Sequence, residues 1–292
     1  MGPFDLADNL AYQRWREHKL AHAVTRADEL IVEVRNPHAV SAAERMAILA
    51  CCQRSNMAVY ATNIELDESG LQAFSAQFGL RRLDANWLAG ESGITRIAVS
   101  SRDDQQRQTY IPYTDRPIKW HTDGYYNPPE RQIQAMVLHC VRSAGQGGEN
   151  RVMDHEIAYL MLRDANPDFI RALSAPDVMT IPERVDETDG IRPAQSGPVF
   201  SVNAAGQLHM RYTARTRSIV WKPDELTGTA VAQLESVLAT PTPHILGVRL
   251  EAGMGLLCNN VLHDRSAFVD DPAHPRLLLR GRYLDRVTGL KS

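Results

Sequence analysis

Hydrophobic residues recur along this chain with two different spacings, and the change of spacing separates helix-rich from strand-rich segments. Apolar side chains three or four positions apart predict amphipathic helices, three before residue 80 and three after it. Polar residues suited to capping precede several of these stretches, including a Ser41/Glu44 capping box. The predicted helices cover 8–24, 41–53, 67–79, 167–173 and 223–238. A further helix is predicted to begin at Asp154, with Ile157, Leu160 and Met161 facing inward.

Strands dominate the rest of the chain, as short apolar runs bounded by Gly, Pro, Asn or Asp. No repeat or linker divides the sequence, so we expect helices inserted into a sheet built from distant segments: an α+β, mainly β fold in one domain, 1–292. Its core is expected at about 55–285, and 1–30 is expected to be a helical arm, packed on the body or on a second subunit. The predicted strands are 57–62, 95–100, 108–113, 118–123, 132–142, 244–250, 255–263 and 276–284, with a hairpin of 199–202 and 207–212 and a flexible loop at Gly145, Gly147 and Gly148.

Composition excludes several classes of protein. The 292 residues are 43% hydrophobic and 23% charged, with a net charge of −3, so there is no basic footprint for nucleic acid. No apolar run is long enough to cross a membrane, and residues 1–9 lack the features of a signal peptide, which predicts a cytoplasmic protein. The four cysteines (Cys51, Cys52, Cys140 and Cys258) form no CxxC pair and are interpreted as buried free thiols.

Candidate metal ligands lie far apart in the sequence. His121 and Asp123 are two positions apart, which on a strand would place both on one face, with Thr122 pointing away. His263 ends the apolar run 256–262, interpreted as a buried strand. Two imidazoles and one carboxylate can occupy one face of a ferrous ion and leave the opposite positions open. A lone His-x-Asp is more often structural, so the prediction depends on its combination with a downstream arginine.

That arginine belongs to the run 276–284, which predicts a strand with Arg276, Arg280 and Arg282 on one face. Guanidinium groups in a dry interior require anions or carboxylates nearby. We therefore expect Arg276 to hold an acidic co-substrate. For Arg280 both an anion-binding role and a surface position stay open, and Arg282 is expected to point outward at the strand end.

These motifs together resemble the TauD/TfdA family of Fe(II)/2-oxoglutarate-dependent dioxygenases. The resemblance spans about residues 55–285, and parts of it, 147–173 and 280–285, are similar to the γ-butyrobetaine hydroxylase branch. The matching segments are Trp120 to Asp123, Gly147 to Asn150, Leu262 to Phe268, Arg276 with Arg280, and FSAQFG at 74–79, which resembles the family's early helix.

The resemblance implies a double-stranded β-helix, or jelly roll, with helices around it. It implies that His121, Asp123 and His263 ligate Fe(II) and that Arg276 binds the far carboxylate of 2-oxoglutarate. Asn150 stands where the family often has threonine or serine beside that carboxylate. Arg280 matches the position that meets the acidic group of substrate in taurine-using members. The implied reaction consumes O2 and 2-oxoglutarate, releases succinate and CO2, and hydroxylates a C–H bond; the presence of Asp123 favours hydroxylation over halogenation.

The substrate is expected to be a small anionic molecule. Tyr125 and Tyr126 follow the first metal motif, and Arg211 follows a hairpin, so all three are candidate substrate contacts; aromatic packing on the barrel rim is the equally open alternative for the tyrosines. Members of the family are often dimers or tetramers, so a homodimer and a homotetramer are both alternatives, and the oligomeric state stays open. A non-catalytic metal-binding jelly roll, acting as a sensor or scaffold, stays open, although it would not need Arg276. A zinc hydrolase is disfavoured because no HExxH motif is present.

Overall fold

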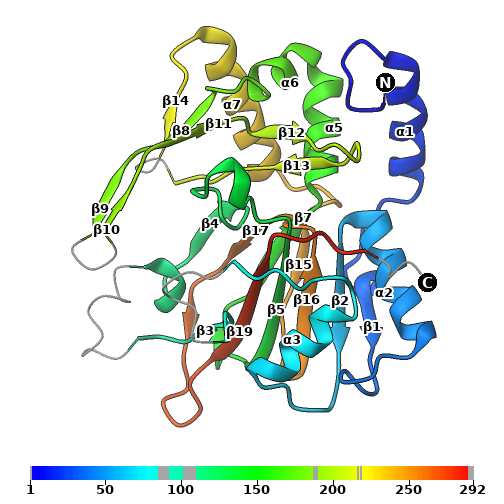
Figure 1. Ribbon diagram of the computed structural model, residues 1–292, viewed down its shortest axis with the longest axis vertical. Helices are drawn as coiled ribbons and strands as arrows, with labels where there is room; N and C mark the ends of the chain where they lie inside the picture. The colour runs from blue at the N-terminus through cyan, green and yellow to red at the C-terminus, as the bar shows by residue number, and fades with distance from the viewer. Residues whose placement is uncertain are drawn as a thin grey trace.

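Two facing β-sheets form the centre of the molecule (Figure 1). The computed structural model describes residues 2–84, 92–100, 110–186, 190–215, 217 and 219–288. Within these residues the larger sheet has the order β1 (Ile31–Glu33), β2 (Met57–Ala61), β16 (Met254–Cys258), β5 (Ala135–Arg142), β19 (Leu277–Tyr283) and β3 (Thr95–Ile97). The smaller sheet has the order β15 (Leu246–Val248), β7 (Asn150–Met153), β17 (Leu262–Arg265) and β4 (Ile118–His121).

The alternation of side chains along each strand explains how the sheets are buried on both faces. On β2, Met57 and Val59 belong to the cluster between the two sheets, whereas Ala58 and Tyr60 belong to the cluster beneath the helices. Those helices are α2 (Ala42–Ser55) and α3 (Glu68–Ala76), which cover the outer face of the larger sheet (Figure 1). Each fully buried large apolar side chain contributes roughly 1.5–3 kcal/mol to the free energy of unfolding. The two clusters therefore stabilise the packing of the sheets on each other and of the helices on the larger sheet. The jelly-roll core predicted from the sequence is confirmed.

A second layer of helices and short strands packs at one end of the smaller sheet (Figure 1). Its helices bury their apolar faces against one another and against a hairpin of β12 and β13. The elements are α5 (His155–Ala165), α6 (Pro167–Leu173), α7 (Glu225–Ala239), β12 (Phe200–Val202), β13 (Leu208–Met210), β8 (Met179–Ile181), β11 (Gln195–Gly197) and β14 (Val220–Trp221). Shorter elements are β6 (Gln146–Gly147) paired with β18 (Phe268–Val269), and the 3-10 turns Ala27–Leu30, Ile111–Tyr113 and Pro129–Arg131.

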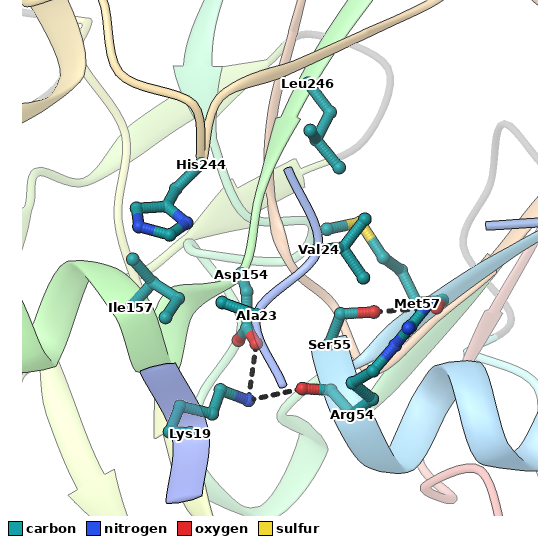
Figure 2. A pocket seen from close by; sticks show the side chains of 10 residues that line it. All are labelled: Lys19, Ala23, Val24, Arg54, Ser55, Met57, Asp154, Ile157, His244 and Leu246. Atoms are coloured by element: carbon teal, nitrogen blue, oxygen red, sulfur yellow. Dashed lines mark hydrogen bonds and ion pairs between the residues drawn. The ribbon is translucent and has the colours of Figure 1, made fainter. Parts of the chain in front are cut away.

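The N-terminal helix α1 (Asn9–Ala21) packs on the body of the protein, one of the two predicted alternatives. Lys19 is buried, and its ammonium lies 2.6 Å from Asp154 and 2.5 Å from Glu156 at the start of α5. It also donates to the main-chain oxygen of Arg54 at the end of α2 (Figure 2). One buried cation therefore connects α1 to two other helices.

Several predicted boundaries are wrong for identifiable reasons. Of the predicted strand 108–113, residues 108 and 109 lie outside the described residues, and Ile111–Tyr113 is a 3-10 turn because Pro112 lacks the amide proton that a strand ladder requires. The loop at the three glycines contains the short strand β6. Strand 255–263 is two strands in different sheets, separated at Asn260, whose φ is 52°. In the described part of the chain, no helix is both long enough and apolar enough to cross a bilayer.

Candidate metal centre

Three predicted ligands meet at the end of the smaller sheet where β4 and β17 are paired. His121 ends β4, and His263 lies opposite it on the antiparallel strand β17, with ring centroids 4.1 Å apart. One ligand atom from each of His121, Asp123 and His263 lies within 4.8 Å of the others. The strand predicted to reach 123 ends at His121, and Asp123 lies in the following turn, where Gly124 has a φ of 67°. As expected from the sequence, the carboxylate of Asp123 still lies on the side of His121, with Oδ1 3.7 Å from Nε2 of that ring.

Main-chain carbonyls orient both imidazoles. Nδ1 of His121 lies 2.9 Å from the carbonyl oxygen of Lys119, and Nδ1 of His263 lies 3.0 Å from that of Val261. A carbonyl can only accept, so Nδ1 carries the proton in each ring and Nε2 keeps its lone pair for a metal. The arrangement fixes both tautomers in the form that ligates.

Charge and burial keep His121 and Asp123 in their ligating protonation states. Burial and the neighbouring His263 lower the pKa of His121 to about 3, so its imidazole is neutral. Burial alone would raise the pKa of Asp123, but the positive charge of Arg280 and other neighbours lowers it well below its usual range. Oδ2 of Asp123 is buried, accepts no hydrogen bond among the described residues and lies 3.3 Å from Nη1 of Arg280. Two imidazoles with Nε2 turned toward each other's site and one carboxylate with a spare oxygen fit a divalent transition metal.

Asn260 holds the turn that carries Asp123. Its Oδ1 accepts from the amide of Asp123 at 2.7 Å, and its Nδ2 donates to the carbonyls of Asp123 at 2.9 Å and Ile133 at 2.7 Å. Asn260 is buried and stands three residues before His263, so one residue links two ligands. The sequence reasoning missed it; the signal was a pair of polar amides, Asn259 and Asn260, inside an apolar run.

A cavity with about 440 Å³ of empty space, partly open to solvent, adjoins the two histidines. Its wall includes Arg276, which is buried, places its guanidinium 4.9 Å from the ring centre of Phe268, and has an Nη1 without a hydrogen-bond partner among the described residues. Arg265 lies beside it and donates to the carbonyls of Thr114 and Arg116. Burial and the charge of Arg276 lower the pKa of Arg265 to about 9. Two adjacent guanidiniums with an unused donor favour an anion in this cavity. The contribution of Arg265 was also missed.

Asn150 and Arg280 line the same cavity. Nδ2 of Asn150 donates to the carbonyl of Asp264 at 2.8 Å, while its buried Oδ1 has no partner among the described residues. Arg280 is largely buried and is ion-paired with Asp123, so the surface alternative for Arg280 is wrong.

The sequence and the fold were compared with those of known proteins. The profile described as taurine catabolism dioxygenase TauD, TfdA family matches residues 18–282. The chain belongs to the TauD/TfdA family. Uridine-5'-phosphate dioxygenases from Amycolatopsis sp and Streptomyces sp are each 30% identical to it, over 57% and 58% of the chain. The chain covers only 60% and 62% of the lengths of these two relatives.

Solved structures of low sequence identity share the TauD/TfdA fold. An asparagine oxygenase in complex with Fe(II), 3-hydroxyasparagine and succinate has a TM-score of 0.62 at 15% identity, covering 85% of this chain and 81% of that one. AAD-2 in complex with Mn(II) and N-oxalylglycine has a TM-score of 0.63 at 12% identity, covering 89% and 97%. A taurine dioxygenase from Burkholderia xenovorans has a TM-score of 0.58 at 18% identity, covering 88% of each chain.

The remaining predicted site residues lie beside this TauD/TfdA centre. Tyr125 and Tyr126 form an edge-to-face pair, and the hydroxyl of Tyr126 accepts from Nη1 of Arg282 at 2.6 Å. Arg282 is buried and pairs with Asp84 at 2.8 Å, so the prediction that it points outward is wrong. The aromatic loop is therefore anchored to β19.

Arg211 has a different role from the predicted substrate contact. Its guanidinium is buried and donates to main-chain carbonyls of Tyr125, Met179, Gly197 and Gln195 at distances between 2.7 and 3.3 Å. Because these carbonyls occupy its donors, Arg211 connects β8 and β11 to the aromatic loop. The prediction for Arg211 is corrected accordingly, whereas substrate contact by the tyrosines stays a prediction.

Proposed function

We propose that this protein is an Fe(II)- and 2-oxoglutarate-dependent dioxygenase that hydroxylates a C–H bond of a small anionic molecule. It would consume O2 and 2-oxoglutarate and release succinate and CO2. One observation carries the proposal: the His121, Asp123 and His263 cluster lies beside a cavity in which the buried Arg276 keeps an unused donor. A site for metal alone would have no need of that guanidinium.

Each residue of the site would have a definite task. His121, Asp123 and His263 would hold iron by one face and leave positions for 2-oxoglutarate and O2. Iron bound there supplies oxygen activation. Arg276, supported by Arg265, would bind the far carboxylate of 2-oxoglutarate.

The rest of the cavity would set the orientation of the co-substrate and limit solvent access. Asn150 would contribute its free amide oxygen or, after rotation, its amide protons. The apolar wall formed by Ile97, Ile118 and Leu278 would restrict water. Arg280 would hold Asp123 and extend a positive field toward the substrate.

A nucleoside 5'-phosphate is the first substrate class to test. The curated relatives are named for uridine-5'-phosphate, which agrees with the expectation of an anionic substrate. Arg280 lines the cavity, and the positive charge of its guanidinium would favour a negative group over a neutral analogue.

The test is aerobic turnover by the Fe(II)-loaded protein with 2-oxoglutarate and uridine 5'-phosphate, followed through succinate. Asp123→Ala should abolish substrate-coupled succinate formation, whereas Asp168→Ala, at an exposed position on α6, should leave it intact. Absence of iron-dependent 2-oxoglutarate turnover across a broad panel of small acids would refute the proposal. Metal binding without 2-oxoglutarate binding would support the sensor or scaffold alternative.

We also propose that residues 1–292 form one oxygenase domain. The cytoplasmic location and the homodimeric or homotetrameric state stay predictions. Light scattering on the purified protein measures the oligomeric state directly.

A further inference from the structure

The hydroxyl group of Tyr126 has one hydrogen-bond partner and the capacity for another. It accepts from Nη1 of Arg282 at 2.6 Å. A phenol can accept and donate at the same time, and no group in the described part of the chain accepts the hydrogen of this hydroxyl. Tyr126 is half-buried and lies three residues after Asp123. Its hydroxyl is therefore a donor with an unused hydrogen beside the metal centre.

Strand pairing places this hydroxyl on the cavity side of the larger sheet. Arg282 on β19 lies directly opposite Met136 on the neighbouring strand β5 (Figure 1). Directly opposed residues point to the same face of a sheet, so Arg282 shares its face with Met136, which lines the cavity beside the metal centre. Arg280, two positions earlier on the same face of β19, lines that cavity as well. The hydroxyl held by Arg282 is thus directed to the wall that carries Arg280.

The orientation of this hydroxyl is fixed by groups that are themselves held in place. Arg282 is buried, and its Nη2 forms an ion pair with Asp84 at 2.8 Å, so the guanidinium that binds the hydroxyl is anchored. The ring of Tyr125 meets the ring of Tyr126 edge to face, with ring centres 5.2 Å apart. Because both its ring and its oxygen are held, Tyr126 offers its hydrogen with little loss of conformational entropy on binding.

The surroundings of the hydroxyl favour an acceptor with a negative charge. Arg192 ends β10 (Gly190–Arg192), which pairs with β9 (Arg184–Asp186), and its guanidinium lies 5.1 Å from the ring centre of Tyr126. Arg192 has no carboxylate partner among the residues that the structure describes, so its charge is not balanced there. Donation by Arg282 also polarises the phenol, which strengthens the hydrogen bond that the O–H group can donate.

We propose that Tyr126 is a specificity-determining residue that donates a hydrogen bond to the anionic group of the substrate. This inference rests on the proposed function and adds the residue that recognises the charged group. Arg282 positions the hydroxyl, and Arg192 supplies positive charge beside the ring. The hydroxyl adds direction to this attraction, because an O–H bond points at a single acceptor atom.

Removal of a single oxygen atom tests the inference by equilibrium binding, without requiring turnover. The probes are uridine 5'-phosphate and uridine, titrated by calorimetry into the protein loaded with Mn(II) and N-oxalylglycine. Tyr126→Phe should weaken binding of uridine 5'-phosphate by about 10-fold or more, since a hydrogen bond to a charged group is lost. Binding of uridine should change far less, because uridine lacks the anionic group.

Tyr125→Phe is the matched control. It removes the same atom from the neighbouring residue, whose hydroxyl makes no hydrogen bond within the described ranges. This variant should keep both affinities.

The ratio of the two affinities separates recognition from damage. A disturbed loop would weaken binding of both ligands together, whereas loss of a contact to the anionic group lowers the ratio alone. The inference is overturned if wild-type protein does not prefer uridine 5'-phosphate to uridine, if Tyr126→Phe keeps that preference, or if Tyr125→Phe loses it equally. A preference that depends on Tyr126, without iron-dependent succinate formation on any substrate, would refute the proposed function and leave the inference standing.

Discussion

Asn260 offers the sharpest test of how the fold builds the metal centre. Its side chain makes three hydrogen bonds, two to the main chain of Asp123 and one to Ile133, and its backbone is left-handed with a φ of 52°. Asn260→Gly removes the side chain but keeps the backbone conformation accessible. Asn260→Ala removes the side chain and adds strain.

The expected magnitude follows from the groups left without partners. One buried amide and two carbonyls lose their hydrogen bonds, each at about 1 kcal/mol or more, so Asn260→Gly should lower the free energy of unfolding by about 3 kcal/mol. Asn260→Ala should lower the free energy of unfolding by about 1 kcal/mol more than Asn260→Gly, because alanine is strained at the positive φ of this position. Release of the Asp123 turn should also weaken metal binding by about 10- to 100-fold, as is typical when a group that orients a ligand is removed.

Denaturant unfolding measures the first effect and anaerobic calorimetry with Fe(II) the second. Asn259→Ala is the matched control: Asn259 is also buried, but its side chain binds Asn56 and Val287 and does not contact Asp123. This variant should lose stability and keep metal affinity. Metal affinity within threefold of wild type in Asn260→Gly, or an equal loss in the control, would refute the reasoning.

Three further predictions concern other parts of the molecule. Arg276→Gln should raise the KM for 2-oxoglutarate by about 10- to 100-fold in a succinate assay, because a charged hydrogen bond is lost. Lys19→Met should cost about 3–5 kcal/mol of unfolding free energy, because Asp154 and Glu156 lose their buried cation. Burial lowers the pKa of His209 from 6.5 to about 3. As the pH falls below 6.5, the imidazole of His209 is therefore protonated in the unfolded chain but stays neutral in the folded protein. At pH 5 this should lower the stability by about 2 kcal/mol relative to pH 7.5, and His209→Gln should remove that contribution from urea unfolding curves.

Matched controls make these outcomes decisive. Arg171→Gln, on an exposed side chain, should leave the KM for 2-oxoglutarate unchanged, and an equal rise would contradict the role of Arg276. Lys222→Met, at an exposed ion pair, should cost less than about 1 kcal/mol. If His209→Gln loses stability between pH 7.5 and pH 5 as steeply as wild type, the buried imidazole is not the source.

Local signals were sufficient for many helices and strands. The capping box at Ser41 and the N-cap at Asp67 start helices in the structure as predicted, because these side chains bind amides in their own first turn. The hairpin of β12 and β13 also follows from a local turn. By contrast, the prediction joined β16 and β17 into one strand, since an apolar run carries no information about the change of sheet at Asn260.

The sequence by itself determined the chemistry available to this protein: two histidines, a carboxylate and three arginines on one predicted strand, in an arrangement typical of the TauD/TfdA family. Only the tertiary structure decided the task of each group. Asp123 lies in a turn whose main chain is hydrogen-bonded by Asn260, and Arg265 lies beside Arg276. The guanidinium of Arg211 donates to main-chain carbonyls, and that of Arg282 forms an ion pair with Asp84. The charge and hydrogen-bonding capacity of a side chain are set by the residue type alone. Which group it binds depends on the pairing of distant strands, as where His263 on β17 lies opposite His121 on β4, more than a hundred residues earlier.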